Sequence, residues 1–288
     1  MNRRMIAFVG LVGLVLIGGC EPVAPEVDIA KLPCPERIDP RANAALYRAS
    51  EFLKSADTAK YQAVVIRDMS LTLHDEVAIK MGGVAQVTVK HPNKLWVTFQ
   101  GDDRSRAIYF NGEMLTLCSY SKEFYAQLPY KGTTDEAIDY LHDELGFHIA
   151  VSDILYADPY VVLIENVDRG YYVGVSQLPG VECDQLVFQQ ETVDWQIWIE
   201  RGDRPFVRQL VVTYKGEPGA PQVFARFSKW QLNPPISDRT FEFKPEKDLS
   251  QIEFLPMEQM NKGRAALEAK MMEEEVVEES ANPTKGGN

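Results

Sequence analysis

The sequence lacks the short motifs that mark several common classes of enzyme. It contains no Gly-x-Ser-x-Gly, no phosphate-binding loop, no Gly-x-Gly-x-x-Gly, no His-Glu-x-x-His and no Cys-x-x-Cys. Positive charge is also scarce, because 30 lysines and arginines stand against 42 aspartates and glutamates, a net charge of −12. This balance argues against binding to nucleic acid and against electrostatic attachment to anionic lipid. With 45% hydrophobic residues, the 288-residue chain can nevertheless bury a full core.

Histidine is scarce as well, and the four histidines give no strong metal motif. The best candidate is Asp139, His142 and Asp143, whose spacing puts three ligands on one helical face. A solvated helix face explains the same pattern. Carboxylate pairs such as Asp102 and Asp103 arise by chance in so acidic a chain. We therefore predict no catalytic residue, no metal and no cofactor. A hydrolase acting on envelope material is the disfavoured alternative to a protein that is not an enzyme.

The only strongly hydrophobic run lies at the N-terminus and is short. Arg3 and Arg4 precede the apolar residues 5–17, which are fewer than the roughly 20 that a membrane-spanning helix needs. The run ends in Ile17-Gly18-Gly19-Cys20, which resembles a bacterial lipobox. We predict a signal peptide over 1–19 and lipid attachment to Cys20, with ordinary cleavage near Gly19 as the alternative. Acyl chains would contribute roughly 0.8 kcal/mol of membrane affinity per buried CH₂.

The predicted location is the bacterial cell envelope, as an outer-membrane lipoprotein that faces the periplasm. Position 21 is Glu, whereas Asp there typically signals retention in the inner membrane. Three cysteines follow Cys20, namely Cys34, Cys118 and Cys183, so at most one bridge can form among them within the chain. A Cys118–Cys183 disulfide is one alternative, and buried unpaired thiols are the interpretation that we prefer.

The rest of the chain divides into a spacer, one domain and a tail. Residues 20–38 are rich in proline and read as an extended tether. The folded domain is expected over 39–255, and it opens with a helix from the Asp39-Pro40 cap to about Ser55. Residues 256–288 form an acidic tail that we expect to be mobile.

Within the domain, apolar residues alternate with polar ones, as in half-buried antiparallel strands. Strands are expected between 60 and 127, with a hairpin at Asn111-Gly112, and again over 171–176, 182–190, 194–200, 207–215, 222–231 and near 241–243. A helical pair interrupts them at 133–157, with a capping box at Thr133 and Glu136 and a second short helix that ends before Pro159. The pattern predicts an α+β fold in which a wide sheet curls under a helical flap.

Apolar and aromatic side chains on these strands are the candidates for a ligand cavity. An apolar hollow in a curved sheet would bind an acyl chain by burying its surface. A completely filled core is the alternative, and the sequence alone does not separate the two. The residues expected to line the core or cavity are Leu95, Val97, Phe99, Ile108, Phe110, Leu115, Leu117, Trp195, Ile197, Leu210, Val212 and Phe227, with Leu141, Leu145 and Leu155 as a lid.

Several longer strings resemble a known bacterial family of predicted periplasmic proteins, a domain of unknown function. Residues 153–160 read DILYADPY, 193–200 read VDWQIWIE and 212–222 read VTYKGEPGAPQ, and the opening of the domain at 39–42 and the stretch 109–129 resemble the family too. The family is similar in fold to the lipoprotein carrier LolA, the receptor LolB and lipoprotein-sensing stress regulators. The resemblance implies a curved antiparallel half-barrel over about 39–254, and it implies no established activity or site residue.

The function predicted from these observations is binding of a hydrophobic ligand by a lipid-anchored envelope protein. The expected ligand is a lipid or the acyl chain of a lipoprotein. Because Cys20 would tether the chain, a receptor or sensor role fits better than a free shuttle. The alternative is an interaction or sensor scaffold with a filled core and no ligand, whose protein partner the sequence does not identify.

Overall fold

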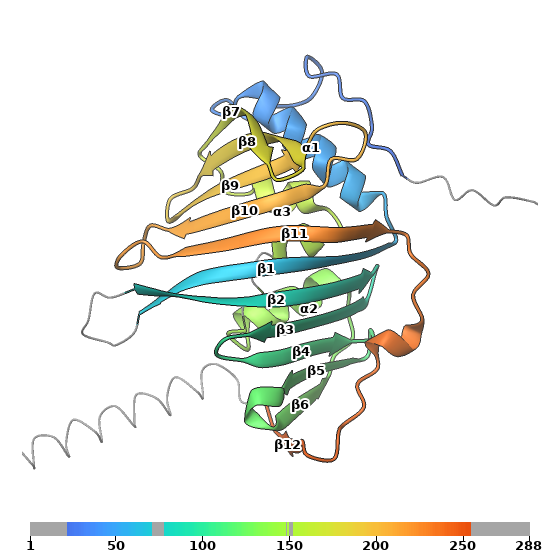
Figure 1. Cartoon of the computed structure of the whole chain (residues 1–288). Coiled ribbons are helices and arrows are strands. Elements are labelled where there is room, and N and C mark those ends of the chain that lie inside the picture. The colour runs from blue at the N-terminus through green and yellow to red at the C-terminus, as the bar shows by residue number, and fades with distance from the viewer. Residues whose placement is uncertain (1–21, 71–77, 148, 150–151, 255–288) are drawn as a thin grey trace, which may run out of the picture.

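The computed structural model describes residues 22–70, 78–147, 149 and 152–254, and one wide sheet dominates them (Figure 1). The sheet has twelve strands within this part of the chain, in the order β12-β6-β5-β4-β3-β2-β1-β11-β10-β9-β8-β7. It is open and curved, and helices lie behind one of its faces. The predicted α+β class, with a curved antiparallel sheet and a helical flap, is confirmed.

Two antiparallel meanders make up all of the sheet except β12 and meet at β1 and β11. Val65 of β1 lies opposite Ala225 of β11 at this junction. The first meander comprises β1 (Thr58–Ser70), β2 (Ala78–Lys90), β3 (Lys94–Gly101), β4 (Ser105–Phe110), β5 (Met114–Ser119) and β6 (Phe124–Pro129), with the short 3-10 helix η1 (Tyr120–Lys122) before β6. The second comprises β7 (Arg169–Leu178), β8 (Val181–Gln189), β9 (Val193–Glu200), β10 (Val207–Tyr214) and β11 (Gln222–Leu232).

The helices between and before the meanders follow local capping signals. Helix α1 (Pro40–Lys54) begins where the Asp39 carboxylate accepts a hydrogen bond from the Arg41 backbone N–H at 2.8 Å. Helix α2 (Thr134–Asp143) begins with the predicted capping box of Thr133 and Glu136. The 3-10 helix η2 (Ser152–Leu155) and helix α3 (Pro159–Ile164) follow, and α1 packs against α3 and against β7 to β9.

Three local predictions differ from the structure. The strand expected near Phe241–Phe243 is wrong, because residues up to Phe241 form the 3-10 helix η3 (Asp238–Phe241), capped by the Ser237 side chain. The second short helix, η2, ends before Pro159 as predicted, but helix α3 was not predicted; Pro159 opens it, since proline is well suited to the first turn of a helix. The short strand β12 (Ser250–Ile252) was not predicted, and it pairs in parallel with β6.

Much of the segment expected to be a tether contacts the domain. The Ala24 N–H donates to the Asp203 carbonyl at 2.9 Å, and the buried Asn43 donates through Nδ2 to the Pro33 carbonyl at 3.0 Å. Ile38 is buried and forms a bridge with Gly170 at the start of β7. Any free spacer is therefore shorter than 20–38.

Three other predictions concern residues outside the part of the chain that the structure describes. They are the signal peptide over 1–19, the lipid on Cys20 and the acidic tail over 256–288. Among the residues that the structure describes, no helix combines the length and apolar character needed to cross a membrane. The three described cysteines are free, with Cys118 in β5 and Cys183 in β8 both buried.

Candidate functional site

On one face of the sheet, the core covers β3 and β4 around Leu95 and Phe110, and a cavity lies farther along the same strands, around Phe99 and Arg106. The cavity has a volume of about 360 Å³. Its strand lining comes mainly from one face of β1, β2, β3 and β4, with contributions from β10 and β11, and residues 146, 147 and 149 also line it. The apolar lining residues are Tyr61, Ala63, Val65, Ala85, Val87, Val97, Phe99, Ala107, Ile108, Phe147, Ile149, Tyr214 and Val223, together with Gly146.

Two glycines make room for the floor of this cavity. A Cβ atom on Gly83 would lie 2.4 Å from Cζ of Phe99, and one on Gly101 would lie 2.6 Å from its Cε1. The Phe99 ring therefore lies against the backbone of both β2 and β3. A side chain at either glycine would push the ring away from the sheet and into the cavity.

The predicted ligand residues divide between the cavity and the solid core. Val97, Phe99 and Ile108 line the cavity. Nine others are buried in the core cluster, where helices cover the sheet: Leu95, Phe110, Leu115, Leu141, Leu155, Trp195, Ile197, Leu210 and Phe227. Leu117, Leu145 and Val212 are partly buried and pack against that core. Of the expected lid residues, Leu141 and Leu155 are thus part of the core, and residues 146, 147 and 149 are the ones that reach the cavity.

Three arginines also line the cavity, and the sequence analysis did not select them. They are Arg67 on β1, Arg104 directly before β4, and Arg106 on β4. A signal was present, since Arg106 lies in phase with Ile108 and Phe110 on one strand face, and Arg67 continues the alternation of Tyr61, Ala63 and Val65. An arginine at the end of an apolar alternation marks the edge of a buried face.

The arginines differ in their partners. Asp103 accepts hydrogen bonds from Arg67 at 2.7 Å and from Nε of Arg104 at 2.7 Å, and these contacts hold the pKa of Asp103 below its usual value, the hydrogen bond from Arg104 being the largest cause. Arg106 lies with its guanidinium carbon 5.4 Å from the centre of the Phe147 ring. Burial, aided by the positive charge of Arg104 and Arg67, lowers the pKa of Arg106.

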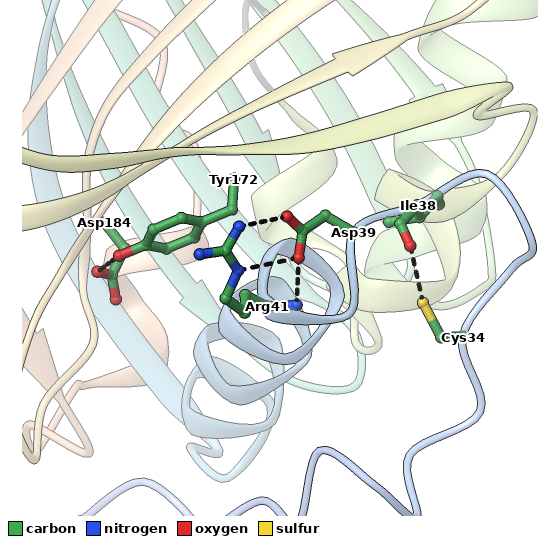
Figure 2. A network of polar contacts seen from close by, with 6 residues as sticks. All are labelled: Cys34, Ile38, Asp39, Arg41, Tyr172 and Asp184. Carbon is green, nitrogen blue, oxygen red and sulfur yellow. Dashed lines mark hydrogen bonds and ion pairs between the residues drawn. The ribbon is translucent and has the colours of Figure 1, made fainter.

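A second hollow of about 590 Å³ lies between residues 24–29, α1 and the strands β7 and β8. Three of its lining residues, Arg41, Tyr172 and Asp184, belong to the network of polar contacts in Figure 2. Asp39 accepts from the Arg41 side chain at 2.8 Å, Arg41 lies 4.8 Å from the centre of the Tyr172 ring, and the Tyr172 hydroxyl donates to Asp184 at 2.7 Å. Cys34 donates to the Ile38 carbonyl at 3.3 Å in the same region. This network fastens the N-terminal segment and α1 to the sheet edge.

The candidate metal ligands of α2 have other partners. Tyr156 donates its hydroxyl to Asp139 at 2.6 Å, and His142 contacts Asp143 at 2.7 Å. Within the described ranges, no group of three or more histidine, cysteine, aspartate or glutamate side chains is arranged to hold a metal ion.

Several solved structures resemble this chain at low sequence identity. An uncharacterized conserved protein from Thermus thermophilus is 10% identical, with a TM-score of 0.44 over 74% of this chain and 99% of that one. LprF from Mycobacterium bovis is 11% identical, with a TM-score of 0.41 over 70% and 97%. A LolA superfamily protein from Nitrosomonas europaea is 13% identical, with a TM-score of 0.33 over 70% and 97%.

These TM-scores are low, and the family of the chain follows from a family model instead. No curated protein matches the chain. A family model does match, over residues 42–255, and its description is "predicted periplasmic protein (DUF2092)". Since this match spans well over half of the 288 residues, the chain belongs to that family of predicted periplasmic proteins.

Proposed function

We propose that this protein binds an acyl chain, carried by a lipid or an acylated protein, in the cavity on the concave face of its sheet. The observation that carries the proposal is the cavity of about 360 Å³, lined by apolar side chains from β1 to β4. Small-molecule sites typically measure about 300–1,000 Å³ and are mostly apolar, with a few polar groups. The cavity lies at the lower end of that range, which suits one chain better than several.

The shape of the lining supports an elongated ligand. From Arg67 to Tyr61 the lining follows β1, which corresponds to about 20 Å of strand. Along this path the inward residues on β1 are apolar, and the arginines gather at the Arg67 end. An acyl chain would bury its methylene groups along the strand and place its polar end near the arginines.

The proposal includes a place for the protein in the cell. The family description supports a periplasmic location, and the lipobox-like Ile17-Gly18-Gly19-Cys20 supports anchoring by lipid at the outer membrane. Labelling cells with an alkyne analogue of palmitate tests the anchor. Incorporation into the wild-type protein and its loss in Cys20→Ser are expected, and equal labelling of the two proteins contradicts lipid attachment to Cys20.

The polar groups that line the cavity are suited to binding a ligand rather than to catalysis. They are three arginines and the hydroxyls of Tyr61 and Tyr214. Arginine does not give up its proton in proteins, and burial raises the pKa of both tyrosines. A general base or an activated nucleophile would need the opposite properties.

Lipid extraction from two variants of adjacent residues tests the binding. Ala85 points into the cavity from β2, and Gln86 occupies the opposite face of the same strand. The wild-type protein and Gln86→Phe are expected to co-purify with acyl lipid that mass spectrometry detects after organic extraction, whereas Ala85→Phe fills the cavity and loses it. Equal lipid content in the two variants, or none in the wild type, rejects the proposal.

A scaffold function is the second candidate, and one surface favours it. The edge strand β7 exposes Tyr171, Val173 and Val175 in a row, and each of these side chains is about half exposed. Apolar rows on a sheet edge suit strand-to-strand or face-to-face contact with another protein. Loss of a cross-linked partner in Val173→Lys, with the lipid content unchanged, would favour this candidate over acyl-chain binding.

A further inference from the structure

Arg106 stands apart from the other charged groups around the cavity. Its guanidinium faces the Phe147 ring, and in the described part of the chain it makes no side-chain hydrogen bond or ion pair. Asp103, the acid whose charge acts on Arg106, already accepts from Arg67 and Arg104. Asp102 accepts from the Gly82 N–H at 2.8 Å instead.

This arrangement leaves a local excess of positive charge where the cavity lining changes from apolar to polar. Three arginines line the cavity in a chain whose net charge is −12, and Asp103 pairs with two of them, Arg67 and Arg104, but not with Arg106. A partly buried guanidinium that lacks an acidic partner is costly, because burial removes water without replacing its hydrogen bonds. Burial and the like charges of Arg104 and Arg67 also lower the pKa of Arg106, which reflects the same cost.

An anionic oxygen group placed at Arg106 would remove that cost. Carboxylate and phosphate oxygens accept two parallel hydrogen bonds from a guanidinium, and such bonds are about twice as strong as neutral ones. Arg106 lies opposite Phe99 in the register of β3 and β4, so a group bound there would lie directly next to the apolar floor. The same ligand could therefore meet both surfaces.

We propose that the cavity selects a single-chain amphiphile with an anionic oxygen head group, and that Arg106 recognises that head group. The inference rests on the proposed acyl-chain binding and adds the chemistry of the polar end. A fatty acid supplies a carboxylate and a lysophospholipid supplies a phosphate, and both present the shared chemistry. A neutral alcohol or a wax of the same chain length does not.

Photo-crosslinking in membrane vesicles that contain the full chain tests the proposal. The probes are a diazirine- and alkyne-bearing hexadecanoic acid, the corresponding hexadecanol, and a lysophosphatidic acid with the same chain. Peptide mapping locates the labelled residues. In the wild type, both anionic probes are expected to label peptides from β3 and β4, and the more efficient of the two identifies the natural source of the head group.

Substitutions at Arg106 separate the head group from the chain. Arg106→Gln is expected to reduce labelling by the anionic probes by about tenfold or more, the value of one charge-assisted hydrogen bond, and to leave hexadecanol labelling unchanged within about twofold. Arg106→Lys keeps the charge and should restore part of the anionic labelling. Arg208→Gln is the control for losing an arginine beside a phenylalanine ring, because Arg208 also lies 5.4 Å from such a ring, that of Phe206, but outside the cavity; unlike Arg106, it also pairs with Glu200.

The remaining outcomes contradict head-group recognition by Arg106, acyl-chain binding, or both. Equal labelling by acid and alcohol that Arg106→Gln does not change overturns the head-group inference and leaves acyl-chain binding standing. No labelling of cavity peptides by any probe overturns both. If Arg106→Gln loses all labelling, competition in the wild type decides: the inference requires unlabelled hexadecanoic acid to compete about tenfold better than hexadecanol, and equal competition overturns it.

Discussion

Substituting Gly83 by alanine should destabilise the protein, although alanine is normally the better residue in regular structure. The added Cβ would lie 2.4 Å from Cζ of Phe99 and 2.7 Å from the Cα atom of Gly101. Carbon atoms prefer separations of about 3.5–4.0 Å, so the ring must move by about 1 Å and the strands must also adjust. Overpacking of this kind costs about 1–3 kcal/mol of unfolding free energy.

Gly82 provides a matched control in the same strand. A Cβ there would meet its nearest atom at 3.6 Å, an ordinary contact, and neither glycine has a left-handed backbone. In both variants, alanine lowers the conformational entropy of the unfolded chain, which stabilises the fold by the same amount, roughly 0.4–1 kcal/mol. The difference between the two variants therefore isolates the contact with Phe99 and the Gly101 backbone.

Urea unfolding of the purified protein, followed by tryptophan fluorescence, measures this difference. We expect Gly83→Ala to unfold at lower urea than Gly82→Ala, by an amount equivalent to about 1–3 kcal/mol. Adding Phe99→Leu should recover part of the loss in Gly83→Ala and little in Gly82→Ala, since only the first pair is in contact. Equal midpoints for the two glycine variants would refute the description of the cavity floor.

Three further predictions concern the N-terminal half and the thiols. The hydrogen bond from Arg41 is the main cause that lowers the pKa of Asp39. Ionised Asp39 therefore stabilises the fold at pH values above its unfolded pKa, and this stabilisation is lost as the pH falls through the lowered pKa. In Asp39→Asn, the unfolding free energy should consequently depend less on pH on the acid side. Asn43→Ala should cost about 1–3 kcal/mol in urea unfolding, because it leaves the Tyr160 hydroxyl and the Pro33 carbonyl without their partner. Burial raises the pKa of Cys183 to about 11, so iodoacetamide at neutral pH should modify Cys34 before Cys183 in the folded protein and both equally in urea.

The strand faces were predictable because a period of two is a local property. Leu95, Val97 and Phe99 were placed on one face from the sequence, and the structure places them there. The division between core and cavity was not predictable in the same way. Leu95 is fully buried under the helices, whereas Phe99, four residues later on the same face, lines the cavity. That difference depends on where helices from distant parts of the chain cover the sheet.

Proline gave an ambiguous signal at Pro159, which could end one helix or begin the next. The Asp158 side chain resolves the ambiguity by capping α3, a contact that depends on the path of the preceding loop. The arginines of the cavity were overlooked for a different reason. Reactive groups and apolar strand faces can be recognised in a sequence, whereas Arg106 matters because it lacks an acidic partner in the described fold, which only the structure reveals.

The charge of the whole chain and the charge at the cavity have opposite signs, and distance determines which one a ligand experiences. At physiological ionic strength, charges more than about 8 Å away in solvent are largely screened. An anionic amphiphile at the cavity would therefore respond mainly to Arg67, Arg104 and Arg106, and only weakly to the acidic surface elsewhere. Salt screens exposed charges more than buried ones, and the arginine that recognises the head group is partly buried. High salt should therefore weaken binding of the anionic probes less than it weakens binding of an anionic ligand at an exposed basic patch.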